Sequence, residues 1–304
     1  MKNILVTGGT GATGEATIQW LLQQYPQAKI IIVGRNPQKL AAIQKKYRVR
    51  IAQLDFSQPN TIFLHQLQAC DFPQIDILIH LVAVVPSHAR DIEDFYRINF
   101  INSRTLLQNI DFREHAGILN FSSASVYNTC SVHLKESSPL TTTDDYGISK
   151  YLFENFVYEH ARTLHIRSLS VRVPVLLVPF VQNNFIAKWR DQLLKGSEVT
   201  LFNPKSLFNS CVWVEDIFSF FQKIITNRTI HNLTCNVGAK DGISIEDAFY
   251  TLSEAYKIHA VYREMKNNRV AQDFDISLAI SYGYNPLSVV NGLQKIAFGE
   301  QKTC

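Results

Sequence analysis

The stretch VTGGTGATGEATIQWLL, residues 6–22, decides the fold of this chain. A short apolar run, NILVT, stops at a series of glycines, and residues 14–25 then carry apolar side chains at helical spacing. Glycine lets a chain turn tightly and lets a ligand approach the main chain. The N–H groups at the start of a helix attract phosphate. Gly8, Gly11 and Gly14 therefore predict a phosphate-binding turn between a first strand and a first helix, with a tight turn lacking a ligand as the alternative.

Strands and helices alternate through the first half of the chain. Apolar runs predict further strands at 29–34, 49–55, 75–85, 117–123 and 166–174, and helical spacing predicts helices at 37–47, 91–110 and 142–156. Nearly continuous apolar strands separated by helices are typical of a parallel sheet covered on both faces. We predict an α/β fold, a doubly wound parallel (Rossmann) sheet with right-handed crossovers and strand order 3-2-1-4-5-6.

The regular alternation ends near residue 174, where segments become shorter and aromatic residues more frequent. We therefore predict a dinucleotide-binding Rossmann domain over residues 1–175. A smaller C-terminal substrate lobe is expected over 176–304, with the segment at about 212–240 returning to the first domain. The chain has no internal repeat and no low-complexity tract.

Composition excludes several classes of protein. The chain has 304 residues, of which 46% are hydrophobic, with a net charge of +4, which is ordinary for a globular protein. Lys and Arg are scattered except at 45–50, so no nucleic-acid partner is expected. The apolar run at 77–85 is too short to span a membrane, and the N-terminus lacks a signal sequence, so we expect a cytoplasmic protein without a membrane partner. Five cysteines without metal-ligand or redox spacing predict reduced thiols and no metal site.

The end of the second predicted strand, VGRNPQK, bears on the choice of cofactor. In a dinucleotide-binding fold, an acidic residue near this point binds the ribose 2′-hydroxyl, whereas an arginine accommodates a 2′-phosphate. Gly34, Arg35 and Asn36 include no acid, so Arg35 favours NADP(H), with NAD(H) left possible and a surface arginine as the alternative. Asp55, after the third strand, is a candidate for the adenine amine, or else a turn residue or helix N-cap.

The segment TTDDYGISKYLFENF, residues 142–156, places Tyr146 and Lys150 four residues apart at the head of a predicted helix. Residues at this spacing share one helix face. A phenol has a pKa of about 10, and an adjacent ammonium together with a positively charged nicotinamide lowers it, so that a tyrosine can exchange a proton with a substrate near neutral pH. We therefore expect a lowered pKa for Tyr146, with a solvated helix surface as the alternative.

Taken together, these motifs resemble the extended short-chain dehydrogenases/reductases, the NAD(P)-dependent epimerase/dehydratase family. The resemblance covers nearly the whole chain and rests on TGGTGATG, LDFS, HLVAVVP, YRINFINSRTLLQ, FSSASVY, Tyr146-x-x-x-Lys150, VWVEDI, CNVGAKDGISIEDA and SYGYNPLSVVNGL. It implies an enzyme in which Tyr146 is the acid/base, Lys150 its electrostatic partner, and Ser123 a hydrogen-bond donor to the same substrate oxygen. It implies cofactor contacts from Gly8, Thr10, Gly11, Ala12, Thr13, Gly14, Arg35, Asp55, Phe56, Leu81, Val82, Ala83, Asn99, Tyr146, Lys150 and Pro174.

The resemblance implies an NADP(H)-dependent oxidoreductase that reduces a carbonyl or oxidises a secondary alcohol, with a nucleotide-activated sugar as the expected substrate. The alternatives are an NAD-dependent nucleotide-sugar epimerase/dehydratase and a non-catalytic NADP-sensing protein. The family commonly pairs the two helices at 91–110 and 146–164 with those of a second copy, so a homodimer is expected.

Three positions depart from the pattern that the nucleotide-sugar enzymes of this family often show. Val175 stands where they carry a substrate-contacting Asn, Asn209 where an Arg grips a diphosphate, and Trp213 where a His is usual. The first two departures weaken the case for a UDP-sugar epimerase. Other candidates for substrate contact, each with a plain structural alternative, are Asn183, Asn184, Lys188 and Arg190.

Overall fold

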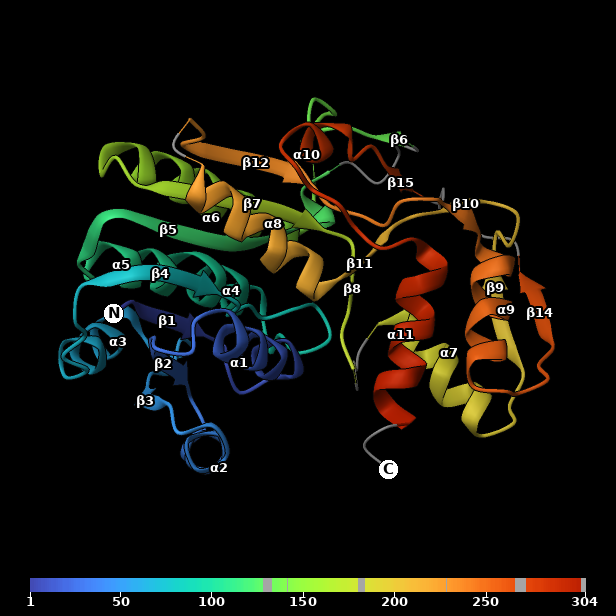
Figure 1. Cartoon of the computed structure of the whole chain (residues 1–304), viewed down its shortest axis with the longest axis horizontal. Helices are drawn as coiled ribbons and strands as arrows, with labels where there is room; N and C mark the ends of the chain where they lie inside the picture. The colour runs from blue at the N-terminus through green and yellow to red at the C-terminus, as the bar shows by residue number, and fades with distance from the viewer. Residues whose placement is uncertain (128–132, 141, 180–183, 228, 266–271, 302–304) are drawn as a thin grey trace. The chain divides into compact units, whose positions relative to one another are not determined.

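The computed structural model describes residues 1–127, 133–140, 142–179, 184–227, 229–265 and 272–301 (Figure 1). The chain divides into two compact units. Unit 1 comprises Met1–Val126, Thr141–Arg172 and Phe221–Cys235, and unit 2 comprises Tyr127–Leu140, Val173–Phe220 and Asn236–Cys304.

These boundaries differ from the predicted ones in three places, of which one is that the main segment of unit 1 ends at Arg172 and not at residue 175. Residues 127–140 were expected in the first domain but belong to unit 2, because β6 (His133–Leu134) pairs with β15 (Asp273–Phe274) there. The segment that returns to unit 1 is 221–235, which is shorter than the predicted 212–240.

Unit 1 is an alternation of strands and helices. Its elements are β1 (Asn3–Thr7), α1 (Ala12–Gln24), β2 (Lys29–Gly34), α2 (Pro37–Tyr47), β3 (Arg50–Gln53), α3 (Asn60–Gln68), β4 (Ile75–His80), α4 (Ile92–Tyr96), η1 (Arg97–Asn102), α5 (Ser103–Gln108), β5 (Phe112–Ser123), η2 (Ala124–Val126), α6 (Asp145–Thr163) and β7 (Arg167–Val173). It also takes in the C-terminal part of α8 (Val214–Thr226) and nearly all of β12 (Asn232–Asn236).

Within the described residues, a seven-stranded sheet has the order β12-β7-β5-β4-β1-β2-β3. The pairs β1–β2, β1–β4, β2–β3 and β4–β5 are parallel, with Leu5 opposite Ile31 and Leu78. The order is the predicted one, extended at one edge by β12. The chain runs outward from β1 through β2 to β3 and then returns to place β4 on the other side of β1. The winding therefore reverses beside β1, and ligands of such sheets bind at the carboxyl ends of the strands there.

Helices cover both faces of this sheet (Figure 1). One core fills the space between the strands and α3 to α6, and its buried members include Leu5, Ile31, Leu78, Ile118, Phe63, Leu106, Phe153 and Val157. On the opposite face, Gly117 of β5 makes room for α8, since a Cβ at this position would lie 2.4 Å from the Ile225 side chain. The doubly wound α/β architecture is therefore confirmed.

The helix predicted over 91–110 is interrupted by one turn of π-helix. Asp91 caps α4 by accepting a hydrogen bond from the Asp94 N–H, and η1 then separates α4 from α5. Such turns are rare and occur frequently at functional sites. Here the π-turn carries Asn99 and Asn102, both fully buried, whose side chains bond to neighbouring loops.

Unit 2 is built from shorter elements. They are β6, β8 (Val175–Leu177), α7 (Phe185–Leu194), β9 (Val199–Phe202), β10 (Leu207–Phe208), β11 (Cys211–Trp213), the start of α8, β13 (Ile243–Ser244), α9 (Ile245–Ala255), β14 (Tyr262–Met265), β15, α10 (Ser277–Ser281) and α11 (Val289–Gln301). Its strands pair two by two, and its core gathers Trp189, Phe208, Trp213, Phe249 and Leu293. Short pairs without a continuous sheet explain why no regular pattern marks this half of the sequence.

Candidate active site

The glycine-rich turn combines two packed glycines with one open glycine. Gly8 has a φ of +68°, which side chains rarely adopt, and a Cβ on Gly14 would lie 2.4 Å from the main chain of Gly9. A Cβ on Gly11, in contrast, would meet only the Gly8 carbonyl oxygen, 3.9 Å away. Gly8 and Gly14 therefore hold the turn against the first helix, while Gly11 leaves its outer side open.

The helix start beside Gly11 fits a phosphate. Helix α1 begins at Ala12, two residues earlier than predicted, and its N-cap Gly11 provides no side-chain hydrogen bond. Gly11 and Ala12 are exposed, with Thr10 and Thr13 partly exposed next to them. The first N–H groups of a helix have no partner inside the helix, and together with the helix dipole they favour an anion. The residues present thus suit the pyrophosphate of a dinucleotide.

Arg35 and Asp55 take different positions near this turn. Arg35 is exposed directly after β2, and the next residue, Asn36, uses its side chain to cap α2. The Asp55 carboxylate accepts hydrogen bonds from the Ser57 and Gln58 side chains. Burial would raise the pKa of Asp55, but these bonds and the positive charge of Arg35 outweigh it and lower the pKa. The Asp55 carboxylate thus takes part in the turn that follows β3, and its predicted contact with the adenine amine stays a prediction.

The loop after β4 is held by Asn99 from the π-turn. The Val84 N–H donates to Asn99 Oδ1 at 2.8 Å, and Asn99 Nδ2 donates to the Val84 carbonyl at 3.1 Å. The same Nδ2 lies 3.0 Å from Ser149 Oγ on α6. Asn99 is thus occupied by the protein, and it links α6 to a loop in which Leu81 and Val82 are partly exposed and Ala83 is exposed.

A neutral histidine lies beneath the same loop. His80 is buried, with Nδ1 3.0 Å from Thr7 Oγ1 and Nε2 3.0 Å from Ser103 Oγ. Ser103 donates its hydroxyl proton to the Ile98 carbonyl, so His80 Nε2 carries the proton and Nδ1 accepts one from Thr7. Burial, assisted by the charge of Lys150, lowers the pKa of His80 to about 3. The sequence did not single out this network.

Ser123 and Tyr146 meet at the end of β5. Ser123 is the last residue of β5 and is buried, and its side chain lies close enough to the Tyr146 phenol to lower the pKa of that group. The Ser125 N–H donates to Ser123 Oγ at 3.1 Å, which fixes the serine rotamer. Tyr146 lies in the first turn of α6, where Asp144 is the N-cap. The two side chains therefore lie near each other, as a shared substrate oxygen would require.

In the protein without a bound nicotinamide, the pKa of Tyr146 is raised, and the lowered pKa expected beside the cofactor stays a prediction. Burial raises the pKa of the phenol, the Ser123 side chain opposes this, and the negative charge of Asp144 adds to the increase. Burial also lowers the pKa of Lys150 to about 8, against the effect of Glu154. The helical spacing was correct, but it gave no information on desolvation, which here exceeds the influence of neighbouring charges.

Lys150 lies on the same face of α6 as Tyr146 and is 3% exposed. Its ammonium forms no hydrogen bond with any residue in the described ranges, although it acts on the charge of His80. A buried ammonium with donors to spare can bind ribose hydroxyls and stabilise a phenolate. The roles of Ser123, Tyr146 and Lys150 remain predictions, and this geometry is compatible with them.

Two predicted cofactor residues are placed differently from the others. The Phe56 side chain is buried in the core, with its ring centroid 4.8 Å from that of Phe63, and its carbonyl accepts a hydrogen bond from Asn102 Nδ2. Pro174 follows β7 and belongs to unit 2. The predicted contact of Pro174 with a dinucleotide therefore stays a prediction.

The three residues that depart from the family pattern contact other residues of unit 2. Asn209 Nδ2 donates to the Phe274 carbonyl at 2.8 Å, and its Oδ1 accepts from the Phe274 N–H at 2.9 Å. Val175 packs against the core of unit 2, and Trp213 is buried, with the Lys295 ammonium 4.5 Å from its ring centroid. These three side chains serve the fold of unit 2.

The other residues considered for substrate contact differ in their surroundings. Asn184 caps α7 by accepting from the Ala187 N–H, so its structural alternative is correct. Arg190 is buried and pairs with Asp191 at 2.8 Å, whereas Lys188 is exposed. Asn183 lies outside the described residues.

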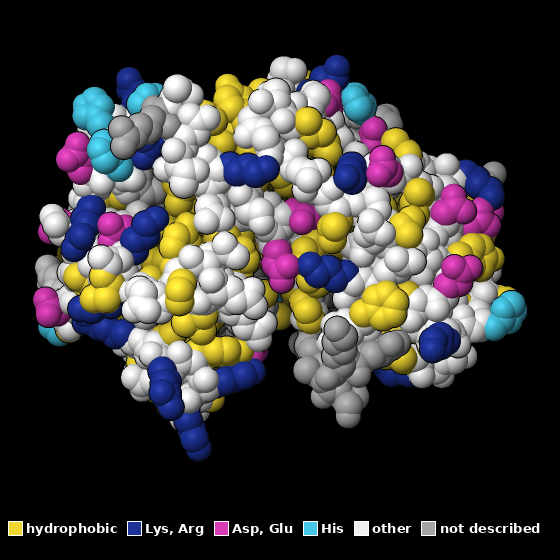
Figure 2. Space-filling view, in the orientation of Figure 1, with side chains coloured by type: hydrophobic (Ala, Val, Ile, Leu, Met, Phe, Trp, Pro, Cys, Tyr) yellow, Lys and Arg dark blue, Asp and Glu magenta, His cyan; other side chains and the backbone are white. Residues whose placement is uncertain are grey.

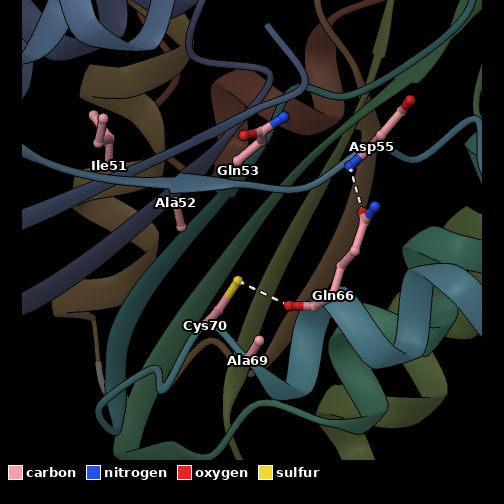
Figure 3. Close-up of a pocket in the computed structure, with 7 residues that line it drawn as sticks. All are labelled: Ile51, Ala52, Gln53, Asp55, Gln66, Ala69 and Cys70. Carbon is pink, nitrogen blue, oxygen red and sulfur yellow. Dashed lines mark hydrogen bonds between the residues drawn. The ribbon is translucent and has the colours of Figure 1, made fainter. Parts of the chain in front are cut away.

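A pocket of about 470 Å³ lies beside β3, at the edge of the sheet. Figure 3 shows its lining, which is Ile51, Ala52, Gln53, Asp55, Gln66, Ala69 and Cys70. The Asp55 N–H donates to Gln66 Oε1, and the Cys70 thiol donates to the Gln66 carbonyl. None of the residues that line it belongs to the glycine-rich turn, so this pocket is separate from the phosphate-binding turn.

The described ranges contain no group of three or more His, Cys, Asp or Glu side chains that could hold a metal ion. Cys70 and Cys211 are free thiols. No helix among the described residues is long and apolar enough to cross a membrane. On the face drawn in Figure 2, Lys and Arg side chains stand among Asp, Glu and uncharged ones.

The fold defines an α/β protein with a doubly wound, Rossmann-like parallel sheet. The model of the NAD dependent epimerase/dehydratase family matches residues 4–238, and the chain belongs to this family. The family resemblance in the sequence and the expectation of an enzyme are thereby confirmed, because members of the family are enzymes.

Known proteins similar to this chain include UDP-glucose 4-epimerase 2 of Arabidopsis thaliana. The two are 24% identical over 97% of this chain and 80% of the relative. Over 51% of the chain and 45% of the relative, a UDP-glucose 4-epimerase of Halalkalibacterium halodurans is 29% identical.

Solved structures share the fold at lower identity. A UDP-glucuronic acid 4-epimerase from Bacillus cereus, in complex with NAD, superposes with a TM-score of 0.77 at 21% identity over 99% of each chain. An ADP-L-glycero-D-manno-heptose-6-epimerase from Helicobacter pylori gives 0.78 at 20% identity, over 97% of this chain and 94% of that one. At these identities the likeness establishes the fold.

Sequence reasoning missed the buried polar residues that support the site. Thr7, His80 and Ser103 form one network, and Glu154 with Arg172 forms a buried ion pair. A signal for Glu154 was present, since it follows Lys150 by four residues and so shares its helix face. No signal in the sequence indicated that Arg172 is its partner, because the two residues lie on different elements.

Proposed function

We propose that this protein is an oxidoreductase of nucleotide-activated sugars that uses NADP(H), with Ser123, Tyr146 and Lys150 as its catalytic residues. The observation that carries the proposal is the proximity of the Ser123 side chain to the Tyr146 phenol, with Lys150 one helical turn further along α6. This arrangement fits a carbonyl or alcohol oxygen that receives one hydrogen bond from each hydroxyl.

The chemistry follows from the positions of the three side chains. A bound nicotinamide supplies or accepts the hydride. Tyr146 gives a proton to the carbonyl oxygen during reduction or takes one from the alcohol during oxidation, and Ser123 polarises the same oxygen. Lys150 stabilises the phenolate of Tyr146 and binds ribose hydroxyls. Because burial raises the pKa of Tyr146 in the protein alone, positive charge beside the phenol is needed for its action as a base.

The preference for NADP(H) rests on Arg35. Its exposed guanidinium directly follows β2, and no acidic residue occupies this point of the chain. A guanidinium can bind a 2′-phosphate through two parallel hydrogen bonds. A carboxylate would instead repel this phosphate and favour the ribose hydroxyl of NAD(H).

A second candidate function is NAD-dependent epimerisation of a nucleotide sugar. It is favoured by the relatives, since both named above are UDP-glucose 4-epimerases. The same three side chains would serve, because an epimerase oxidises a carbon and then reduces it again. Against a UDP-sugar substrate stands Asn209, whose amide is occupied by Phe274 and which has no charge to bind a diphosphate.

The test combines cofactor binding with a product assay. Purified protein is titrated with NADPH, NADP⁺, NADH and NAD⁺, and then incubated with 4-keto and 4-hydroxy nucleotide sugars while the nicotinamide absorbance is followed. We expect tighter binding of NADPH and a stoichiometric loss of absorbance with a keto sugar. Interconversion of two sugars without net change in absorbance would favour the epimerase. Dinucleotide binding without any turnover on these panels would favour the sensing protein.

We also propose that the protein is a cytoplasmic homodimer. Ile92 on α4, Ile101 on η1, and Leu152 and Tyr158 on α6 are exposed hydrophobic side chains of unit 1. Pairing these helices with a second copy through a two-fold interface would cover them. Light scattering at micromolar concentration should give twice the mass of the chain, and a monomer would contradict the proposal.

A further inference from the structure

Three side chains on α6 follow each other at intervals of four residues. Tyr146, Lys150 and Glu154 therefore stand one above the other on a single helix face. Lys150 and Glu154 are each 3% exposed, so both charges are buried beneath the helix. The first two residues have roles in the proposed reaction, whereas Glu154 has none.

Glu154 is paired with an arginine from the sheet. Arg172 of β7 donates from Nη2 to Glu154 Oε1 at 2.6 Å, and its Nε lies 3.3 Å and 3.2 Å from the two carboxylate oxygens. Both side chains are almost completely buried. A buried carboxylate without a partner is strongly unfavourable. The two residues therefore form a neutral unit one turn along α6 from Lys150.

The other groups around Lys150 carry little charge. His80 faces it from β4 and is neutral, because burial lowers its pKa to about 3. From α6 itself, Tyr146 is a neutral phenol because burial raises its pKa. Among the described residues, Glu154 is the charged side chain that acts on the charge of Lys150.

We propose that Glu154 and Arg172 are positioning residues for Lys150. The Glu154 carboxylate favours the ammonium form of Lys150, and Arg172 engages this carboxylate so that Lys150 does not bond to it and turn away from Tyr146. The proposal rests on the function assigned above. It agrees with the direction of the pKa of Lys150, which burial lowers to about 8 and which Glu154 raises.

The primary experiment measures the charge of Lys150 without any substrate. Protein labelled with carbon-13 at lysine Cε is titrated by NMR, and the Lys150 signal is assigned by its loss in Lys150→Met. In Glu154→Gln the positive charge of Arg172 remains while the Glu154 carboxylate is lost, so the titration midpoint of Lys150 should fall by about one pH unit or more. In Arg172→Met the unpaired Glu154 remains, so the midpoint should rise. Midpoints that match wild type in both variants would overturn the proposal.

A double variant keeps the test decisive if single variants do not fold. Glu154→Met/Arg172→Met removes both buried charges, and such replacements are often tolerated. Burial then acts alone on Lys150, so its midpoint should lie below that of wild type and above that of Glu154→Gln. Circular dichroism checks that the double variant is folded. If the folded double variant has the wild-type Lys150 midpoint, Glu154 and Arg172 have only a structural role and the proposal is contradicted. The matched control is Glu159→Gln, which breaks an exposed pair with Arg162 on the same helix and should leave Lys150 unchanged.

A second measurement separates this proposal from the proposed function. The affinity for NADPH is measured against pH, and it should decrease as Lys150 loses its proton, at a pH that moves with the NMR midpoint of each variant. Shifted midpoints without any dinucleotide binding would contradict the proposed function and leave the pairing intact. Dinucleotide binding with pH profiles identical in all variants would contradict the pairing and leave the function intact.

Discussion

The two units treat the residues of the family motifs in opposite ways. In unit 1, the outer side of Gly11 is open, Arg35 is exposed, and Lys150 has no hydrogen-bond partner among the described residues. In unit 2, the oxygen and the nitrogen of the Asn209 side-chain amide both form hydrogen bonds with the Phe274 main chain, and Trp213 is buried. Unit 1 thus leaves Gly11, Arg35 and Lys150 available to a ligand. Unit 2 instead uses Asn209 and Trp213 in its own packing. The chemistry can therefore be inferred from the first unit, while the second gives no direct indication of the substrate.

The largest effect is expected from Tyr146→Phe in unit 1. Loss of the acid/base hydroxyl should reduce turnover by about 10² to 10⁴. Dinucleotide affinity should be nearly unchanged, because the hydroxyl contributes mainly in the transition state. Steady-state kinetics and a fluorescence titration measure the two quantities. Tyr282→Phe is the control, since Tyr282 is an exposed tyrosine at the end of α10, outside α6 and the proposed dimer interface. Equal activity of the Tyr146 variant and the control would exclude Tyr146 as the acid/base.

The next effect distinguishes packed from open glycines. Gly14→Ala places a Cβ 2.4 Å from the Gly9 main chain, so the free energy of unfolding should decrease by about 1–3 kcal/mol. Gly11→Ala meets nothing closer than 3.9 Å, so its stability should change by less than about 0.5 kcal/mol. Its dinucleotide affinity should nevertheless fall, because the added methyl group occupies the open side of the turn. Urea unfolding and a binding titration report the two effects. If Gly11→Ala bound NADPH as tightly as wild type, the hypothesis that this turn binds the pyrophosphate would be excluded.

Arg35→Ala should produce a smaller and selective effect. Loss of charge-assisted hydrogen bonds to a 2′-phosphate should weaken NADPH binding by about tenfold to a hundredfold. NADH binding should change little, since it lacks this phosphate. Lys39→Ala provides the control, because Lys39 is an exposed cation in the first turn of α2. An equal loss for both cofactors would show that Arg35 has no part in the preference for NADPH.

The smallest effect tests the structural role assigned to unit 2. Asn209→Ala leaves the Phe274 N–H and carbonyl without their partners, so the free energy of unfolding should fall by about 1–2 kcal/mol. The KM for the sugar substrate should not change, since the amide is already occupied. Thermal unfolding and steady-state kinetics measure both quantities. A raised KM with unchanged stability would reverse the assignment and make Asn209 a substrate ligand.

The sequence by itself determined the sheet and the catalytic candidates of unit 1. Parallel strands that are buried on both faces appear in a sequence as nearly continuous apolar runs. Such runs made it possible to locate β1 to β5 and β7. Tyr146 and Lys150 could be paired because four residues make about one helical turn. These inferences depend on local geometry, which the order of residues in the chain fixes.

Only the tertiary structure decided which groups surround those candidates. The π-turn that carries Asn99, the partner of Glu154 on β7, and the use of Asn209 within unit 2 all depend on contacts between segments far apart in the chain. The raised pKa of Tyr146 has the same origin, since burial is a property of the packed molecule. Desolvation and long-range hydrogen bonds are set by which elements pack together, and no local sequence pattern encodes them.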